Sequence, residues 1–261
     1  MIRREESDSV WLIHQAAHAF ISGQIAGHWI GQGALTLSLR EELVAAAAYH
    51  DAGWARAERH PRINSQGLPR TFTEMDLDEH FTIWTDSIES VFAQNRYAGL
   101  LTSLHCSDLY QKRLRFLADP PPVRARIHDF LDERQTWEKN LIGLLKSHPR
   151  YALAVEDAAL ACNLRLLQVW DYLSLLICMR PVHEQTLEDV PVGDNQRVLL
   201  RIAGSGPRGI TLDPFPLDQP LTLWIDARQI AGAPFENDEA LRRTLDGAPY
   251  KPLVFEIGPA H

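Results

Sequence analysis

His50 and Asp51 are two strong metal ligands that stand side by side at the end of an alanine-rich apolar run, residues 45–49. A buried carboxylate without a partner is costly, so it usually has a cation or a network of donors around it. The pair therefore predicts a functional site, provided that other parts of the chain supply the remaining ligands.

Candidate partners occur on other segments that are predicted to be helical. They are His18, His80, His105 and Asp171. Together with His50 and Asp51 they offer four imidazoles and two carboxylates, which suit one or two divalent first-row metals such as Fe, Mn, Zn or Ni. A carboxylate beside a histidine can bridge two metals that share an activated water, which makes Asp51 the candidate catalytic residue. Asp171 lies in a segment that is apolar nearly all round, so it is predicted to be buried and to need a partner.

Each candidate histidine has an alternative interpretation. His14 and His28 compete with His18 as the ligand of the first helix. His80 could be a solvated residue at the start of a helix, and His105 could be a hydrogen-bonded histidine of the core. The set makes chemical sense only if its members meet in the fold.

A basic segment follows the pair. Residues 55–75 lack helical periodicity and predict a long loop. Guanidinium groups suit phosphate or carboxylate oxygens, so we expect Arg56, Arg59 and Arg62 to bind a small anionic substrate. The alternative is a solvated loop whose arginines pair with surface acids. Trp54 is expected to form a wall of the substrate pocket, and Trp84 either does the same or packs in the core.

Hydrophobic periodicity predicts helices at residues 10–29, 38–53, 78–95, 98–117, 123–146 and 152–178. After Pro181 the pattern changes, and short runs predict strands at 198–202, 209–212, 221–225 and 253–257. We therefore expect a mainly α protein, with a helical metal-binding domain at 1–181 and a small β-rich appendage at 182–261. Fewer than about 80 residues bury little surface alone, so the appendage is expected to pack on the helical domain.

Composition narrows the classes of function. The formal net charge of −8 argues against nucleic-acid binding, which depends on neutralising phosphates. No apolar run reaches the roughly 20 residues of a membrane span, and we predict a cytoplasmic protein without membrane partners. The three cysteines show no disulfide spacing, and Cys106 is expected to be a buried spectator. The β-rich segment offers a surface for a homo-oligomer.

The order His … His-Asp … His … His … Asp on successive helices resembles the HD superfamily of metal-dependent phosphohydrolases. The chain is also similar to an uncharacterised bacterial family with an HD-like helical core. The stretches that carry this similarity are 18–20, 26–29, 50–54, 61 with 67–69, 100–105 and 213–216.

The resemblance implies that His18, His50, Asp51 and Asp171 hold one metal. Asp51 would then bridge to a second metal, held by His80 and His105. The chain departs from the superfamily at Trp54, where many members have a lysine. The span from His105 to Asp171 is long, which implies an inserted helix at 123–146.

The function that these features predict is metal-dependent hydrolysis of a phosphorylated small molecule or nucleotide by a metal-activated water. Two alternatives stay open. One is an HD-type di-iron oxygenase, which the missing lysine would suit. The other is a non-catalytic HD-like sensor or scaffold.

Overall fold

The structure is a computed structural model of the 261-residue chain, and it describes residues 1–6, 9–32, 38–231 and 234–260. Its strands form one sheet in the order β1-β2-β6-β7-β5-β4-β3. The strands are β1 (Ile2–Glu6), β2 (Ser9–Ile13), β3 (Gln185–Gly193), β4 (Gln196–Gly204), β5 (Gly209–Asp213), β6 (Leu221–Ile230) and β7 (Tyr250–Pro259). All neighbours are antiparallel except β5 and β7, which are parallel. The sheet curls into a half-barrel.

The prediction of a mainly α protein with a small β-rich appendage was wrong, because this seven-stranded sheet is a major layer of the fold. The sheet also takes strands from both sides of the predicted boundary at residue 181. Residues 10–13 belong to β2 and not to the first helix, which begins at Gln15. A short apolar run fits a buried strand as well as a buried helix. The partners decide here, because β1 pairs with one side of β2 and β6 with the other.

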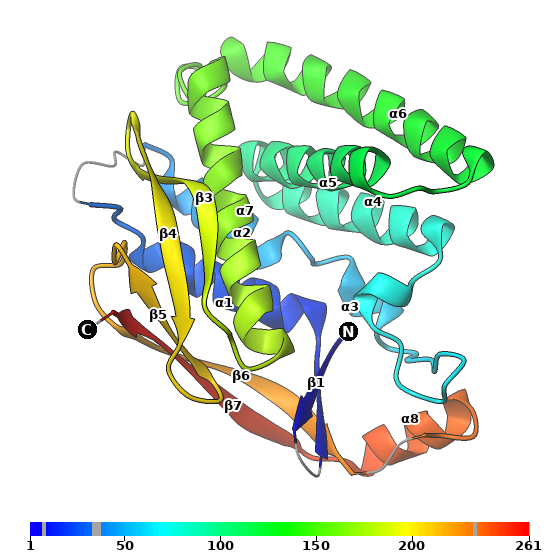
Figure 1. The fold of residues 1–261 in the computed structure, drawn as a ribbon. Coiled ribbons are helices and arrows are strands. Elements are labelled where there is room, and N and C mark those ends of the chain that lie inside the picture. Colours follow the sequence, from blue (N-terminus) through cyan, green and yellow to red (C-terminus); the bar gives the residue numbers. More distant parts are fainter. Residues whose placement is uncertain (7–8, 33–37, 232–233, 261) are drawn as a thin grey trace.

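The helices lie on the concave face of the sheet and beyond it (Figure 1). They are α1 (Gln15–His28), α2 (Arg40–Tyr49), α3 (Trp54–Ala57), α4 (Leu77–Gln94), α5 (Arg96–Phe116), α6 (Pro121–Lys146), α7 (Asp157–Met179) and α8 (Asp238–Gly247). By length and composition α7 could cross a membrane. In this fold it packs against α1, α2, α5 and strands β1 and β3. Its apolar surface is thus used by the core.

The main core joins the inner face of the sheet to α1, α2, α5 and α7. A second apolar cluster joins α4 and α5 to α6, the helix that the sequence predicts as an insertion. The predicted loop after Asp51 contains α3 and a short 3-10 helix, Phe72–Glu74. Thr71 and Glu74 form a capping box that fixes this 3-10 turn.

Gly53 sets how closely the turn after Asp51 approaches α4. Its N–H donates to Ser87 Oγ at 2.9 Å. A Cβ at position 53 would lie 2.2 Å from the carbonyl oxygen of Ile83 and 2.7 Å from the backbone nitrogen of Ser87. The contacts are with backbone, which cannot move aside cheaply. A side chain here would therefore push the His50–Trp54 turn away from α4.

We expect Gly53→Ala to lower the free energy of unfolding by about 1–3 kcal/mol, the range for overpacking a filled site. The matched control is Gly143→Ala in α6, where a Cβ meets nothing within 4 Å. Removing glycine from a helix interior should raise stability there by about 0.5–1 kcal/mol. Urea denaturation measures both variants. Equal responses of the two would contradict the close approach at Gly53.

Candidate metal centre

Five of the six predicted ligands meet where α1, α2, α5 and α7 come together. α1 carries His18, and α5 and α7 carry His105 and Asp171. His50 is the C-cap of α2, and Asp51 begins the turn that follows. All five side chains are buried. The sequence neighbours His50 and Asp51 thus enter the site from a helix end, where the turn lets both point inward.

Each buried carboxylate is shared between imidazoles. Asp51 Oδ2 lies 2.7 Å from His18 Nε2 and 3.7 Å from His50 Nε2. Asp171 lies 3.3 Å from the Nε2 atoms of both His50 and His105. His50 therefore sits between the two carboxylates and connects the two halves of the cluster.

A second layer of hydrogen bonds orients two of the imidazoles. His50 Nδ1 donates to the carbonyl oxygen of Ala47 at 2.9 Å, which leaves Nε2 to face the cluster. His18 Nδ1 lies 2.9 Å from Ser174 Oγ, and that hydroxyl donates to the carbonyl oxygen of Asp171. Such outer partners fix ring orientation and are typical of histidines that bind metal.

The cluster holds positive charge even without a metal. Burial lowers the pKa of His50, but the carboxylates of Asp51 and Asp171 outweigh burial and raise it to about 9. Burial also opposes ionisation of the two carboxyl groups, yet the neighbouring histidines hold the pKa of each below its usual range. Two buried carboxylates therefore demand a cation, and in the chain alone a proton on His50 serves as one.

The donor set fits a divalent first-row metal. Ligand atoms of His18, His50 and Asp51 lie within 4.8 Å of one another, and so do those of His50, His105 and Asp171. Three imidazoles and two carboxylates match the ligand preferences of Zn, Fe, Mn and Ni. The Nδ1 atom of His105 is buried without a hydrogen-bond partner in the described part of the chain.

His80 stands apart from these five residues. Its Nδ1 is 2.7 Å from the hydroxyl of Tyr110, and its ring lies against Trp54 and Trp84. Burial lowers the pKa of His80 to about 4, so the ring is neutral at pH 7. His80 belongs to the same pocket but not to either group of clustered ligand atoms.

Contacts show which of the candidate histidines near the first helix joins the cluster. His14 Nδ1 is 2.8 Å from Glu58, and His28 Nδ1 is 2.9 Å from Asp218. Neither belongs to the cluster, so His18 is the histidine of α1 that reaches it. Cys106 is fully buried, and burial raises the pKa of its thiol well above the usual value, which suits a spectator.

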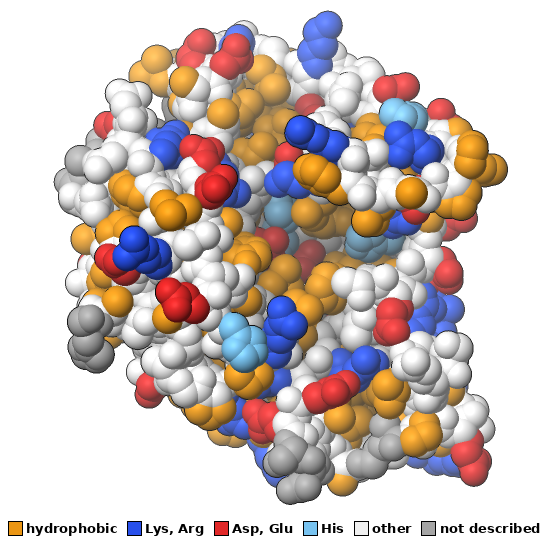
Figure 2. Space-filling model, in the orientation of Figure 1, with side chains coloured by type: hydrophobic (Ala, Val, Ile, Leu, Met, Phe, Trp, Pro, Cys, Tyr) orange, Lys and Arg blue, Asp and Glu red, His pale blue; other side chains and the backbone are white. Residues whose placement is uncertain are grey.

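The cluster opens into a pocket of about 230 Å³. Figure 2 shows the face with a hollow near its middle, where histidine and acidic side chains lie at depth among apolar ones. Apolar walls surround the polar floor. They include Trp54, Phe72, Met75, Trp84, Leu109 and Leu175. Trp54 thus lines the pocket, and Trp84 both lines it and packs in the apolar cluster of α4, α5 and α6.

The arginine in this pocket is one that the sequence did not single out. Arg113 lines it, and its Nε and Nη2 donate to the two oxygens of Asp119 at 2.7 and 2.8 Å. Residues 105, 109 and 113 follow one another at i+4 on α5, which puts them on one helix face. That spacing is the signal that could have identified Arg113.

The predicted substrate-binding arginines lie elsewhere. Arg56, Arg59 and Arg62 line an open surface groove, not the pocket over the cluster. Arg62 pairs with Glu79, and Arg56 lies 4.0 Å from Asp86. The segment that carries them folds along the outside of α4.

Comparison with known proteins identifies a family without a known activity. The family described as "Protein of unknown function (DUF3891)" matches residues 1–232, and the chain belongs to it. No curated protein and no solved structure matches the chain.

Proposed function

We propose that this member of the DUF3891 family is a metal-dependent hydrolase that acts on a small phosphorylated molecule. The observation that carries the proposal is the buried cluster of three histidines and two aspartates at the floor of an apolar pocket that also contains an arginine. A metal site alone would not need the pocket, and a ligand pocket alone would not need two buried carboxylates.

One divalent metal would be held by His18, His50, Asp51 and Asp171. His105, which contacts Asp171, would be a further ligand of the same metal. Such a metal supplies a water of lowered pKa and a Lewis acid for a phosphoryl oxygen. These residues follow the HD order on successive helices, and this order supports a relationship to the HD superfamily.

Arg113 would bind the anionic head of the substrate. Asp119 holds two of its nitrogens in a bidentate pair, so the plane of the guanidinium is oriented. Nη1 forms no hydrogen bond with the residues that the structure describes. This arginine would take the part that a lysine after the His-Asp pair plays in many HD hydrolases, since Trp54 occupies that place and forms an apolar wall.

His80 would act on the leaving group. Burial raises the pKa of the Tyr110 phenol, which therefore keeps its proton. If Tyr110 donates to Nδ1 of His80, the neutral ring carries its proton on Nε2. That N–H could then donate to the leaving oxygen of a substrate. The di-iron alternative would instead require His80 as a metal ligand.

The size of the pocket favours a small substrate. Pockets for drug-sized ligands enclose about 300–1,000 Å³, whereas this one encloses about 230 Å³. A phosphate ester of a few carbons fits this volume better than a nucleotide. A screen of small phosphate esters and nucleotides, with Mn, Fe, Ni and Zn in turn, tests the activity. A folded, metal-loaded protein that turns over none of them would overturn the proposal.

Metal content tests the ligand assignment. We expect one metal per chain in the wild type, and loss of it in His50→Ala and Asp171→Ala, because each removes a buried ligand. His80→Ala should keep the metal, as should the control His28→Ala, whose ring pairs with Asp218 at the surface. Elemental analysis measures all four. Two metals that fall to one in His80→Ala would favour the two-metal arrangement, and an O2-sensitive iron spectrum would favour the oxygenase.

The affinity for metal should depend on pH through His50. Without metal, its pKa is raised from 6.5 to about 9, so at neutral pH a metal must displace a proton. The apparent affinity for Mn²⁺ should therefore rise about tenfold per pH unit from pH 6.5 to 9 and level off above that. The EPR signal of free Mn²⁺ at constant ionic strength measures this. An affinity that stays constant across this range would contradict the assignment of the proton to His50.

Substitution of Arg113 tests the anion site. Losing a charge-assisted hydrogen bond to substrate should lower kcat/KM by about tenfold or more in Arg113→Gln. Arg62→Gln is the matched control, since Arg62 pairs with Glu79 outside the pocket and should keep wild-type kcat/KM. The reverse result would assign substrate binding to the loop.

A further inference from the structure

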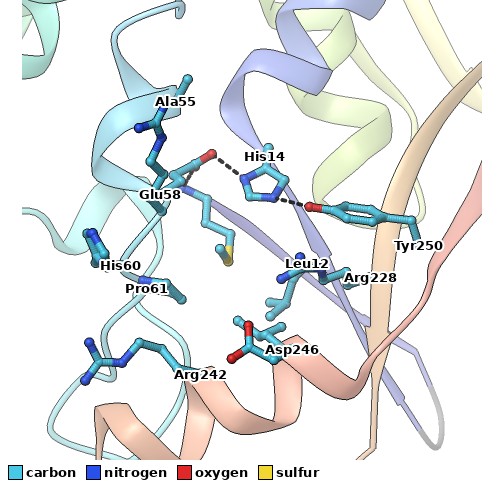
Figure 3. Close-up of a pocket in the computed structure, with 13 residues that line it drawn as sticks. Leu12, His14, Ala55, Glu58, His60, Pro61, Arg228, Arg242, Asp246 and Tyr250 are labelled. Atoms are coloured by element: carbon cyan, nitrogen blue, oxygen red, sulfur yellow. Dashed lines mark hydrogen bonds and ion pairs between the residues drawn. The ribbon is translucent and has the colours of Figure 1, made fainter.

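A second pocket of about 440 Å³ is lined by residues of α3, of the segment that follows it, of the sheet and of α8 (Figure 3). The ends of β2, β6 and β7 form one wall, α8 forms another, and the segment after α3 closes it. None of its lining residues also lines the pocket over the metal cluster. Its volume lies within the range of about 300–1,000 Å³ for small-molecule sites.

Three arginines are among the residues that line this pocket. Arg59, Arg228 and Arg242 line it, in a protein whose net charge is −8. Two acids are also present. Glu58 is already paired with His14 and with the amino group of Met1, whereas Asp246 forms no ion pair with another described residue. Three arginines thus line the pocket beside one carboxylate, Asp246, that has no ion pair with a described residue.

Arg228 is the strongest sign of a ligand. Its guanidinium carbon lies 4.4 Å from the centre of the Tyr250 ring, which fixes its plane. Within the described part of the chain it forms no ion pair, and its buried Nε has no hydrogen-bond partner. A buried donor without a partner is costly, so this group calls for an acceptor. Figure 3 shows Arg228 beside Leu12, across the pocket from His60 and Pro61.

Arg242 supports the same interpretation. Its only ion pair with a described residue is with Glu239 on the same helix, at 3.3 Å, and its Nε is also buried without a partner. An exposed pair of this kind contributes little and leaves the charge available. Apolar surface is present beside these cations in Leu12, Leu245 and Tyr250.

We propose that this pocket binds a small organic anion. Its carboxylate or phosphate head would pair with Arg228, assisted by Arg242. Its apolar body would pack against Leu12 and Tyr250, and Asp246 would accept a hydrogen bond from a hydroxyl or amino group of the ligand. The site is separate from the hydrolase site and does not depend on the proposed activity.

Isothermal titration calorimetry with phenylphosphonate and benzoate tests the site, with benzyl alcohol as the neutral control. We expect at least one of the two anions to bind the full chain, more weakly as salt increases, and benzyl alcohol not to bind. The anion that binds identifies the head group. Binding of neither anion, or equal binding of the alcohol, would overturn the proposal.

Variants locate the binding. Arg228→Gln should raise the Kd about tenfold or more, and Arg242→Gln, on an exposed helix, provides the same test if the first variant does not fold. Arg243→Gln is the matched control, because Arg243 is exposed on α8 and does not line the pocket. Arg113→Gln should leave the Kd unchanged. Loss of binding in Arg113→Gln, or unchanged binding in both Arg228→Gln and Arg242→Gln, would place the anion elsewhere and overturn the proposal.

Discussion

Two buried carboxylates, Asp51 and Asp171, need positive charge beside them, and the rest of the structure depends on this need. Neither can be taken out of water unless partners surround it. The imidazoles that meet this need come from α1, α2 and α5, so these helices and α7 must converge at one point. The curled sheet makes that convergence possible, because its inner face packs against α1 and α7 and so fixes the positions of these two helices. A metal or a proton can satisfy the cluster, but the helices must be in place for either.

The two pockets are neighbours but have no lining residue in common, because α3 and the start of α1 lie between them. Gln15 lines the pocket over the His/Asp cluster and His14 lines the second pocket, and the backbone N–H of Gln15 donates to Glu58. Trp54 is the first residue of α3 and Glu58 is its C-cap, so this single turn of helix separates the two spaces. The cluster of histidines and aspartates lies entirely within the stretch that the family covers, whereas α8 and β7 lie beyond residue 232. The second pocket is thus built partly from elements outside that stretch.

Five residues of the buried cluster could be predicted because their signals are local. A carboxylate in a helix that is apolar nearly all round, as at Asp171, needs a partner whatever the fold, and a histidine beside an aspartate is a recognisable pair. The arginine that lines the pocket over the cluster could not be predicted in the same way. Arg56 and Arg62 are close to Asp51 in sequence, but the chain turns at Gly53 and takes them along the outside of α4. Arg113 is far from Asp51 in sequence and close in space, because the α5 face that carries His105 also carries it.

The sequence by itself determined which residue types must be buried together and which segments are long helices, since helical periodicity and the cost of burying charge act within a few residues of each position. Only the tertiary structure decided that Ser9–Ile13 is a strand, that the C-terminal strands join it in one sheet, and that His80 turns to Tyr110. Strand pairing joins β2 to β6 across about 200 residues of chain, and an apolar run carries no local mark of such a distant partner.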